Sequence, residues 1–217
     1  MLFRNLDQAL YIIPALLIAL TFHEYAHGKM AAILGDPTAR QQGRLTLNPI
    51  HHIDPVGLLM LALAGFGWAK PVPVNPMFFR GDRRRGMVLV ALAGPGTNFV
   101  MALIAAILRN VLLILALNGT IFLFDALDEF FNFLVIFNVF LGVFNLLPVP
   151  PLDGSKILFN LLPPKYSRFM YALERYGFLI LILLLVTRLH EYFLLPAAGF
   201  VLNLVYRVAG VLVTPFF

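Results

Sequence analysis

The chain alternates between long apolar runs and short polar stretches, and several of the runs are long enough to cross a bilayer. A transmembrane helix needs about 20 predominantly apolar residues, and three such runs cover approximately residues 9–34, 87–108 and 130–147. Two further apolar runs, 176–186 and 193–213, indicate a C-terminal hairpin. The pattern predicts an all-α polytopic membrane protein with about four to five transmembrane helices.

The segment between the first two predicted spans, residues 35–86, is rich in proline and glycine. Residues 44–47 and 71–74 have the composition of short strands. Between them, residues 56–66 form an apolar piece that is too short to cross the membrane. We therefore expect a re-entrant or interfacial segment there, together with a small β element on the cytoplasmic side.

Basic residues give the predicted orientation of the spans. They are concentrated in segments 35–86 and 149–175, whereas segment 118–129 has none. By the positive-inside rule, the two basic segments are cytoplasmic and segment 118–129 is outside. The basic residues concerned are Arg40, Arg44, Lys70, Arg80, Arg83, Arg84, Arg85, Lys156, Lys165, Arg168 and Arg175.

The composition agrees with a membrane protein, because only 12% of the 217 residues are charged and 60% are hydrophobic. Soluble domains have about a quarter of their residues charged. We expect residues 1–217 to form one transmembrane domain. No motif for nucleic-acid binding accompanies the net charge of +5, so the basic residues 83–85 are expected to contact lipid headgroups. The chain has no cysteine, so any metal must be bound by His, Asp or Glu.

A cluster of ionisable residues interrupts the first apolar run. His23, Glu24 and His27 lie within it, and ionisable groups inside a span are costly enough to indicate function. Residues four apart on a helix differ by about 40° in direction, so both histidines can bind one zinc ion at about 2.0–2.1 Å. Glu24 can act as a general base on water at the metal. The alternative is a pair of hydrogen-bonded core histidines, which leaves Glu24 without a role.

Asp153 is the candidate for a third ligand, because a catalytic zinc takes three protein ligands and keeps one position open. It lies just past the cytoplasmic end of the third predicted span. His23 is about 16 Å of helix from the cytoplasmic end of the first span, so both residues fall in the same half of the membrane. Prolines before Asp153 break the helix and allow the chain to turn back. The alternative is a turn aspartate before Gly154.

These motifs resemble the site-2 protease family, zinc metalloproteases that cleave transmembrane segments within the bilayer. The resemblance rests on residues 23–27 (HEYAH), 93–98 (AGPGTN) and 145–154 (NLLPVPPLDG). Residues 43–49, 52–57 and 69–75 resemble the compact bacterial branch of the family. We expect a member without an inserted PDZ module and without a span before the metal-binding helix.

The resemblance implies that His23, His27 and Asp153 bind one Zn²⁺ per chain and that Glu24 is the catalytic base. It also implies a transmembrane protein or peptide as substrate, with its unwound strand added to the edge of the extended pieces near 44–47 and 70–75. The protein is then an integral multi-pass protein of the bacterial inner membrane, with its active site towards the cytoplasm.

Other polar residues are further candidates for a role in the site. Asn98 and Asn145 lie in apolar helices and are candidates for donors to the oxyanion or to the substrate backbone. The alternative for both is interhelical hydrogen bonding. His51 and His52 are expected to position their loop rather than bind metal, and Asp54 is expected to be a turn residue.

The sequence therefore predicts a zinc metalloendopeptidase that hydrolyses peptide bonds in or near transmembrane segments, in regulated proteolysis or in the clearance of membrane peptides. Two other classes stay open. A metal-ion transporter would use the same residues as a relay across the membrane, although few further polar residues line the spans. A non-catalytic adaptor would bind substrates without cutting them, in which case an intact Glu24 has no function.

Overall fold

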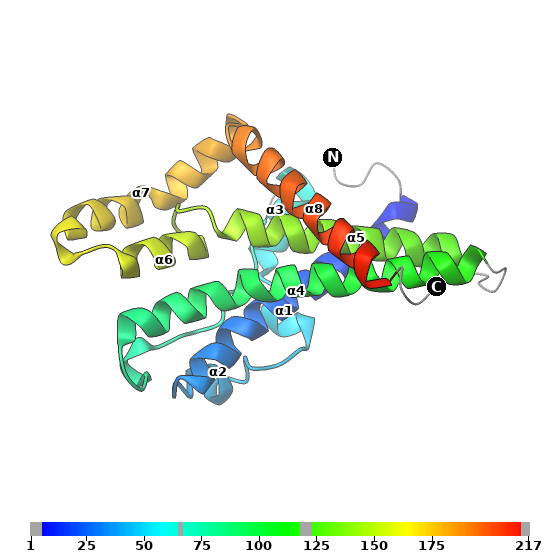
Figure 1. Cartoon of the computed structure of the whole chain (residues 1–217). Helices are drawn as coiled ribbons and strands as arrows, with labels where there is room; N and C mark the ends of the chain where they lie inside the picture. Colours follow the sequence, from blue (N-terminus) through cyan, green and yellow to red (C-terminus); the bar gives the residue numbers. More distant parts are fainter. Residues whose placement is uncertain (1–5, 65–66, 118–122, 214–217) are drawn as a thin grey trace.

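The computed structural model of the chain describes residues 6–64, 67–117 and 123–213. Within these ranges, five helices are long and apolar enough to cross a membrane (Figure 1). The predicted all-α polytopic class and the predicted number of spans are confirmed. The five helices are α1 (Leu6–Ile33), α4 (Arg83–Leu117), α5 (Phe124–Asn145), α7 (Ser167–Val186) and α8 (Glu191–Val213).

Shorter helices connect the long ones and carry part of the functional site. They are α2 (Thr38–Gln41), α3 (Pro55–Ala64) and α6 (Asp153–Leu161), with the 3₁₀ turns η1 (Pro49–His52), η2 (Pro76–Phe78) and η3 (Pro164–Tyr166). At nine residues, α6 is much shorter than a span. It follows the proline-containing turn after α5, as the sequence predicts for the region around Asp153.

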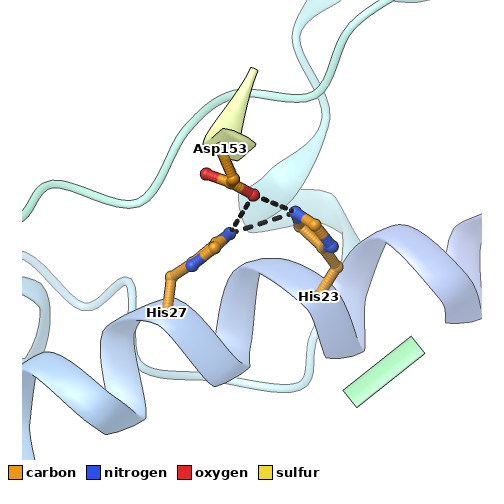
Figure 2. Close-up of side chains that lie close together, drawn as sticks. All are labelled: His23, His27 and Asp153. Carbon is orange, nitrogen blue, oxygen red and sulfur yellow. Dashed lines mark hydrogen bonds and ion pairs between the residues drawn. The ribbon is translucent and has the colours of Figure 1, made fainter. Parts of the chain in front are cut away.

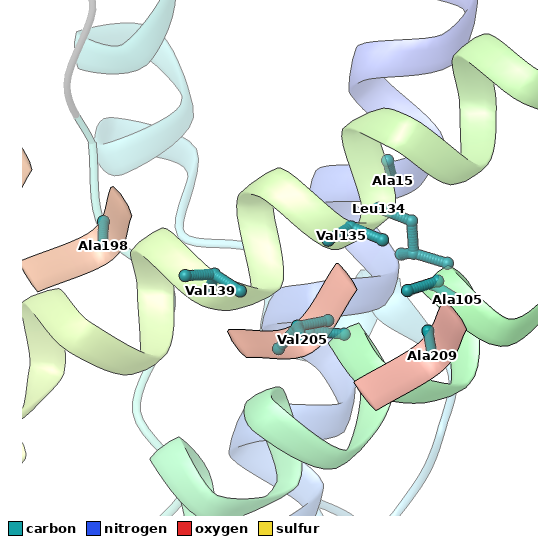
Figure 3. Close-up of a cluster of buried hydrophobic side chains, with 10 residues drawn as sticks. Ala15, Ala105, Leu134, Val135, Val139, Ala198, Val205 and Ala209 are labelled. Atoms are coloured by element: carbon teal, nitrogen blue, oxygen red, sulfur yellow. The ribbon is translucent and has the colours of Figure 1, made fainter. Parts of the chain in front are cut away.

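Helix α4 is the centre of the packing, since it contacts α1, α5, α6 and α8. Helices α1, α4 and α5 run beside one another, and α8 crosses α5 obliquely (Figure 1). Small and β-branched residues fill the interfaces among these four helices (Figure 3), which lets the backbones approach closely in a bilayer. The fully or almost fully buried members include Ala15, Ala105, Val135, Val139, Ala198 and Ala209.

An ion pair explains why two predicted spans are longer than expected. The second predicted span ends near residue 108, yet α4 continues through Arg109 to Leu117. The Nε atom of Arg109 lies 2.8 Å from Oδ1 of Asp128 on α5. Because the two charges are paired, both residues are accommodated inside helices, and α5 begins at Phe124 rather than near residue 130.

The predicted β element is wrong. Among the described residues there is no strand, and the one bridge nearby, an isolated pair between Ile53 and Ala69, lies outside the segments near 44–47 and 70–75. Pro71 and Pro73 lack the N–H groups that a ladder needs. Edge-strand addition of a substrate therefore has no preformed strand to extend in the described part of the chain.

The apolar piece predicted at residues 56–66 is the ten-residue helix α3, and its last two residues, 65 and 66, lie outside the described residues. The helix is too short to span a bilayer. The predicted re-entrant position of α3 is not supported by the structure. No feature of α3 shows whether the helix enters the membrane or lies at the membrane surface.

Candidate metal centre

Three side chains from two distant parts of the sequence converge on one point (Figure 2). His23 and His27 project from adjacent turns of α1, and Asp153 is the first residue of α6. The two Nε2 atoms lie 3.0 Å apart, and Oδ2 of Asp153 lies 3.2 Å from Nε2 of His23 and 3.0 Å from that of His27. Among the described residues, these are the only three of their type placed to bind one metal ion.

The position of Asp153 is fixed from both ends of α6. At the start of the helix, Gly154 allows close packing, because a Cβ atom there would overlap with the carbonyl oxygens of Leu146 and Leu147. At the other end, the guanidinium group of Arg84 on α4 donates to the carbonyl oxygens of Phe159 and Leu162. Arg84 thus caps α6, a role that the expected lipid-headgroup contact did not include.

The hydrogen bonds of the two histidines determine which ring nitrogen atoms are left with a lone pair that can bind a metal. Nδ1 of His27 lies 2.7 Å from the backbone oxygen of Val90, which can only accept. Nδ1 of His23 lies 2.6 Å from Oδ1 of Asn98. Both Nδ1 atoms are therefore donors, and in the neutral rings each Nε2 carries a lone pair directed at the carboxylate.

The orientation of Asn98 is set by a chain of hydrogen bonds across three helices. Its Nδ2 donates to the backbone oxygen of Ala19 on α1 and to Oδ1 of Asn138 on α5. Nδ2 of Asn138 in turn donates to the backbone oxygen of Leu134. Asn98 and Asn138 are both fully buried. Since both donors of Asn98 are used, its Oδ1 must face His23.

The donor set fits a zinc ion. Three lone-pair atoms face one another, and Oδ2 of Asp153 is buried without a hydrogen-bond donor from the described residues. Such an arrangement is repulsive without a cation between the atoms. Tetrahedral zinc with ligand distances of about 2.0–2.1 Å places ligand atoms about 3.3 Å apart, close to the observed 3.0–3.2 Å.

The carboxyl group of Asp153 is held in its ionised form. Burial raises its pKa, but the neighbouring imidazole groups of His23 and His27 and the charge of Lys156 lower it by more, so the pKa lies well below its ordinary value. Nζ of Lys156 lies 3.0 Å from Oδ1, the oxygen that does not face the histidines. Lys156 thereby orients the carboxylate while leaving Oδ2 free for a metal.

Gly94 of α4 packs directly against the two imidazole rings. A Cβ atom at this position would lie 2.7 Å from Cε1 of His23 and would overlap with Nε2 of His27. No side chain larger than hydrogen fits here without displacing the rings. The match of residues 93–98 to the family pattern thus has a steric reason in this glycine.

Glu24 is held by the loop that follows α3. Its Oε2 accepts a hydrogen bond of 2.8 Å from the backbone N–H of Val72. The loop is fixed on either side of Val72, since Lys70 N–H donates to the carbonyl of His52 and Asn75 N–H donates to Asp36. The carboxylate next to the first histidine therefore has a defined position.

The remaining sequence candidates lie outside the cluster of three ligands. Asn98 uses its amide between helices, which favours interhelical hydrogen bonding over donation to a substrate. Asn145 donates to Leu141 in its own helix. Nε2 of His52 donates to the carbonyl of Thr46, and Asp54 caps the start of α3 through Gly57 N–H, as expected for loop-positioning and turn residues.

Sequence reasoning missed Asn138 altogether, and it missed the roles of Gly94 and Lys156 at the site, although it included Gly94 in the motif at residues 93–98 and Lys156 among the basic residues. Asn138 carried a usable signal, because an asparagine in the middle of an apolar span indicates a polar partner on a neighbouring helix. The contacts of Gly94 and Lys156 depend on tertiary packing and have no such local signal.

The chain is similar to a family of peptidases and to proteins named as zinc metalloproteases. A family model described as peptidase family M50 matches residues 108–184, which include Asp153. A protein of Bacillus subtilis named "Putative zinc metalloprotease YwhC" is 43% identical over 195 residues, covering 90% of this chain and 89% of the relative. The chain belongs to peptidase family M50. The resemblance to site-2 proteases is thereby confirmed.

Two further relatives in this family are more distant. A Mycolicibacterium smegmatis protein named "Putative zinc metalloprotease Rip2" is 32% identical over 185 residues, covering 81% of this chain and 66% of the relative. The Mycobacterium tuberculosis protein of the same name is also 32% identical, over 84% of this chain and 69% of the relative. No solved structure matches the chain. Membership of family M50 together with the five apolar helices indicates an integral membrane protein.

Proposed function

We propose that this M50 chain is an intramembrane zinc metalloprotease that hydrolyses peptide bonds in or near the transmembrane segments of membrane-protein substrates. The observation that carries the proposal is the convergence of Asp153 on His23 and His27, which flank Glu24 in a helix long and apolar enough to cross a membrane. The relatives named as zinc metalloproteases support the same chemistry.

His23 and His27 would hold one zinc ion through their Nε2 atoms and Asp153 through Oδ2. Zinc held there supplies a Lewis acid that makes water nucleophilic and polarises the scissile carbonyl group. Glu24 accepts the proton of the attacking water and delivers it to the leaving nitrogen. The hydrogen bond from Val72 N–H holds the Glu24 carboxylate in place for both transfers.

Asn98 and Asn138 would act as positioning residues, because they fix the tautomer and the ring orientation of His23 without contacting the metal. Outer partners of this kind determine how strongly a histidine binds a metal. Asn145 remains a candidate for contact with the substrate backbone, since it is only partly buried near the end of α5.

We further propose that residues 1–217 act as one transmembrane domain in a bacterial inner membrane, with the metal centre towards the cytoplasm. The basic residues of segments 35–86 and 149–175 support this orientation. Asp153 and the Arg84 cap of α6 lie in or beside these segments, at the same end of the molecule.

The proposal is tested with the purified protein in detergent and a library of single-span peptides. We expect cleavage products that vanish with a zinc chelator and return when zinc is added back. Zinc flux into liposomes without any peptide cleavage would favour a transporter instead and would contradict the proposal.

A further inference from the structure

An apolar cavity of about 250 Å³ lies between α1, α3 and α5 and has no part in the chemistry described above. Its walls include Leu20 of α1, Leu58 and Leu61 of α3, and Phe144 of α5, with Trp68 from the loop after α3. A pocket that is mostly apolar with a few polar groups is typical of a ligand-binding site.

The cavity is close to the metal centre on two sides. Leu20 precedes His23 by three residues on α1, so the two side chains lie about 4.5 Å apart along the axis and about 60° apart in direction. On the other side, the lining residue Ala69 belongs to the loop whose Val72 N–H binds Glu24. A group in the cavity would therefore lie about one helical turn from the metal-binding residues.

The cavity also shares part of its wall with a second apolar cavity, which lies beside the segment that precedes Asp153. The second cavity, of about 490 Å³, shares Leu61 and Trp68 with the first. Its lining includes Pro151 and Leu152, which immediately precede Asp153. The two cavities thus contact sequence neighbours of the candidate metal ligands, on α1 and on the segment leading to α6.

One buried polar atom among the lining residues has no partner. His52 lines the first cavity and is 2% exposed. Its Nε2 donates to the carbonyl oxygen of Thr46, so in the neutral ring Nδ1 is an acceptor. No donor from the described residues binds this Nδ1 atom. A ligand that combines an apolar group with an N–H donor would satisfy both the walls and this atom.

We propose that the cavity binds a large apolar side chain of the substrate next to the cleaved bond, and that His52 Nδ1 accepts a hydrogen bond from the substrate backbone. This inference rests on the proposed protease function. A cavity of about 150 Å³ can hold benzene, so the observed volume is sufficient for a leucine or phenylalanine side chain. A lipid acyl chain would fill the walls but offers no donor to His52.

The test compares Leu58→Trp, which fills the cavity, with the matched control Leu59→Trp. The two neighbours on α3 are similarly exposed, Leu58 at 51% and Leu59 at 56%, but only Leu58 lines the cavity. Cleavage sites are first mapped on the wild type, and peptides carrying Ala, Leu or Phe at each position around the bond are then compared. We expect a preference for Leu or Phe at one position.

Leu58→Trp should lower kcat/KM for the Leu and Phe peptides about tenfold or more and leave the Ala peptide within about twofold. Leu59→Trp should behave as the wild type. Zinc content serves as the check that each variant folds. If Leu58→Trp does not fold, Leu17→Ala widens the same cavity and should improve cleavage of a Trp peptide.

The role of His52 is tested with peptides in which single backbone N–H groups are replaced by ester oxygen. One replacement near the apolar position should raise KM in the wild type, and the same replacement should have no further effect in His52→Phe. Equal effects in both proteins would contradict the hydrogen bond.

Other outcomes distinguish failure of the proposed side-chain site from failure of the proposed protease function. Zinc-dependent cleavage without any side-chain preference would overturn the cavity's role and leave the protease function intact. Equal loss of all peptides in Leu58→Trp, varying with lipid acyl-chain length, would assign the cavity to lipid. A wild type that cleaves no peptide would overturn the protease function itself.

Discussion

Nδ1 of His23 on α1 lies 2.6 Å from Oδ1 of Asn98 on α4, and the two residues are 75 positions apart in the sequence. Asn98 is bound in turn by Asn138 on α5. The direction of one proposed metal-binding nitrogen is therefore set by a buried polar chain that crosses three helices. Zinc affinity should depend on residues that never contact the metal.

Replacing Asn98 tests this dependence. Asn98→Ala leaves the His23 Nδ1–H and the Asn138 carbonyl without partners, and loss of such an outer partner weakens metal binding about 10–100-fold. Zinc affinity, measured by competition with a chelator, should fall by that factor. Asn145→Ala is the matched control, because the side chain of Asn145 donates a hydrogen bond only within α5. The zinc affinity of this variant should equal that of the wild type. Equal affinities for the two variants would contradict the role of Asn98.

A methyl group at position 94 should disrupt the metal centre sterically. Gly94→Ala forces both imidazole rings to move, and overpacking of this kind costs about 1–3 kcal/mol of stability. We expect loss of bound zinc and a lower unfolding temperature. Gly96→Ala, two residues further along α4, meets no atom within 4 Å. That control should keep its zinc, and equal zinc loss in both variants would exclude the steric explanation.

Lys156 should have a modest effect on zinc binding. Its side chain is 46% exposed, and such ion pairs contribute about 0.2–1 kcal/mol. Lys156→Met should therefore weaken zinc affinity up to about fivefold, and Lys156→Arg should restore it. A loss as large as that of Asn98→Ala would mean that Lys156 does more than orient the carboxylate.

The ion pair between Arg109 and Asp128 should stabilise the helix packing without affecting the metal. Arg109→Met leaves the partly buried carboxylate of Asp128 unpaired, and losing a charged hydrogen bond costs about 1.5–3 kcal/mol. Thermal unfolding in detergent should shift downwards while zinc per chain stays constant. The double variant Arg109→Met/Asp128→Leu removes both charges and should recover most of the loss; a double variant as unstable as the single one would contradict this account.

The sequence predicted the existence of the helices better than their ends. Hydropathy alone identifies the apolar runs, because a bilayer tolerates few unpaired charges. The hydropathy pattern misplaced the end of α4 and the start of α5. Charged residues such as Arg109 and Asp128 are typical of loops, and the sequence does not show that these two form an ion pair. Helix α7 likewise begins at Ser167, before its apolar part.

The prediction of a β element was wrong for a different physical reason. Residues 44–47 and 71–74 have suitable composition, but their contacts are made by side chains rather than by a ladder. Arg44 donates to the carbonyl of Lys70, and Glu24 accepts from Val72 N–H. Composition indicates an extended backbone, but it does not show which groups will form hydrogen bonds with the backbone N–H and C=O groups.

The metal-binding candidates were predictable because their geometry is local or topological. Helical spacing aligns His23 with His27, and the charge pattern predicts that Asp153 lies on the same side of the membrane. The buried partners were not predictable in the same way. Asn138 and Gly94 acquire their roles only when α4 and α5 pack against α1, which no spacing within one helix specifies.

The most direct test of the account measures zinc content and peptide cleavage together in Glu24→Gln. Glutamine is nearly isosteric and can still contact the Val72 loop, but it cannot accept the proton of the attacking water. The account predicts one zinc per chain, as in the wild type, and no detectable cleavage of a single-span peptide. Cleavage by purified Glu24→Gln at a rate near that of the wild type would contradict it.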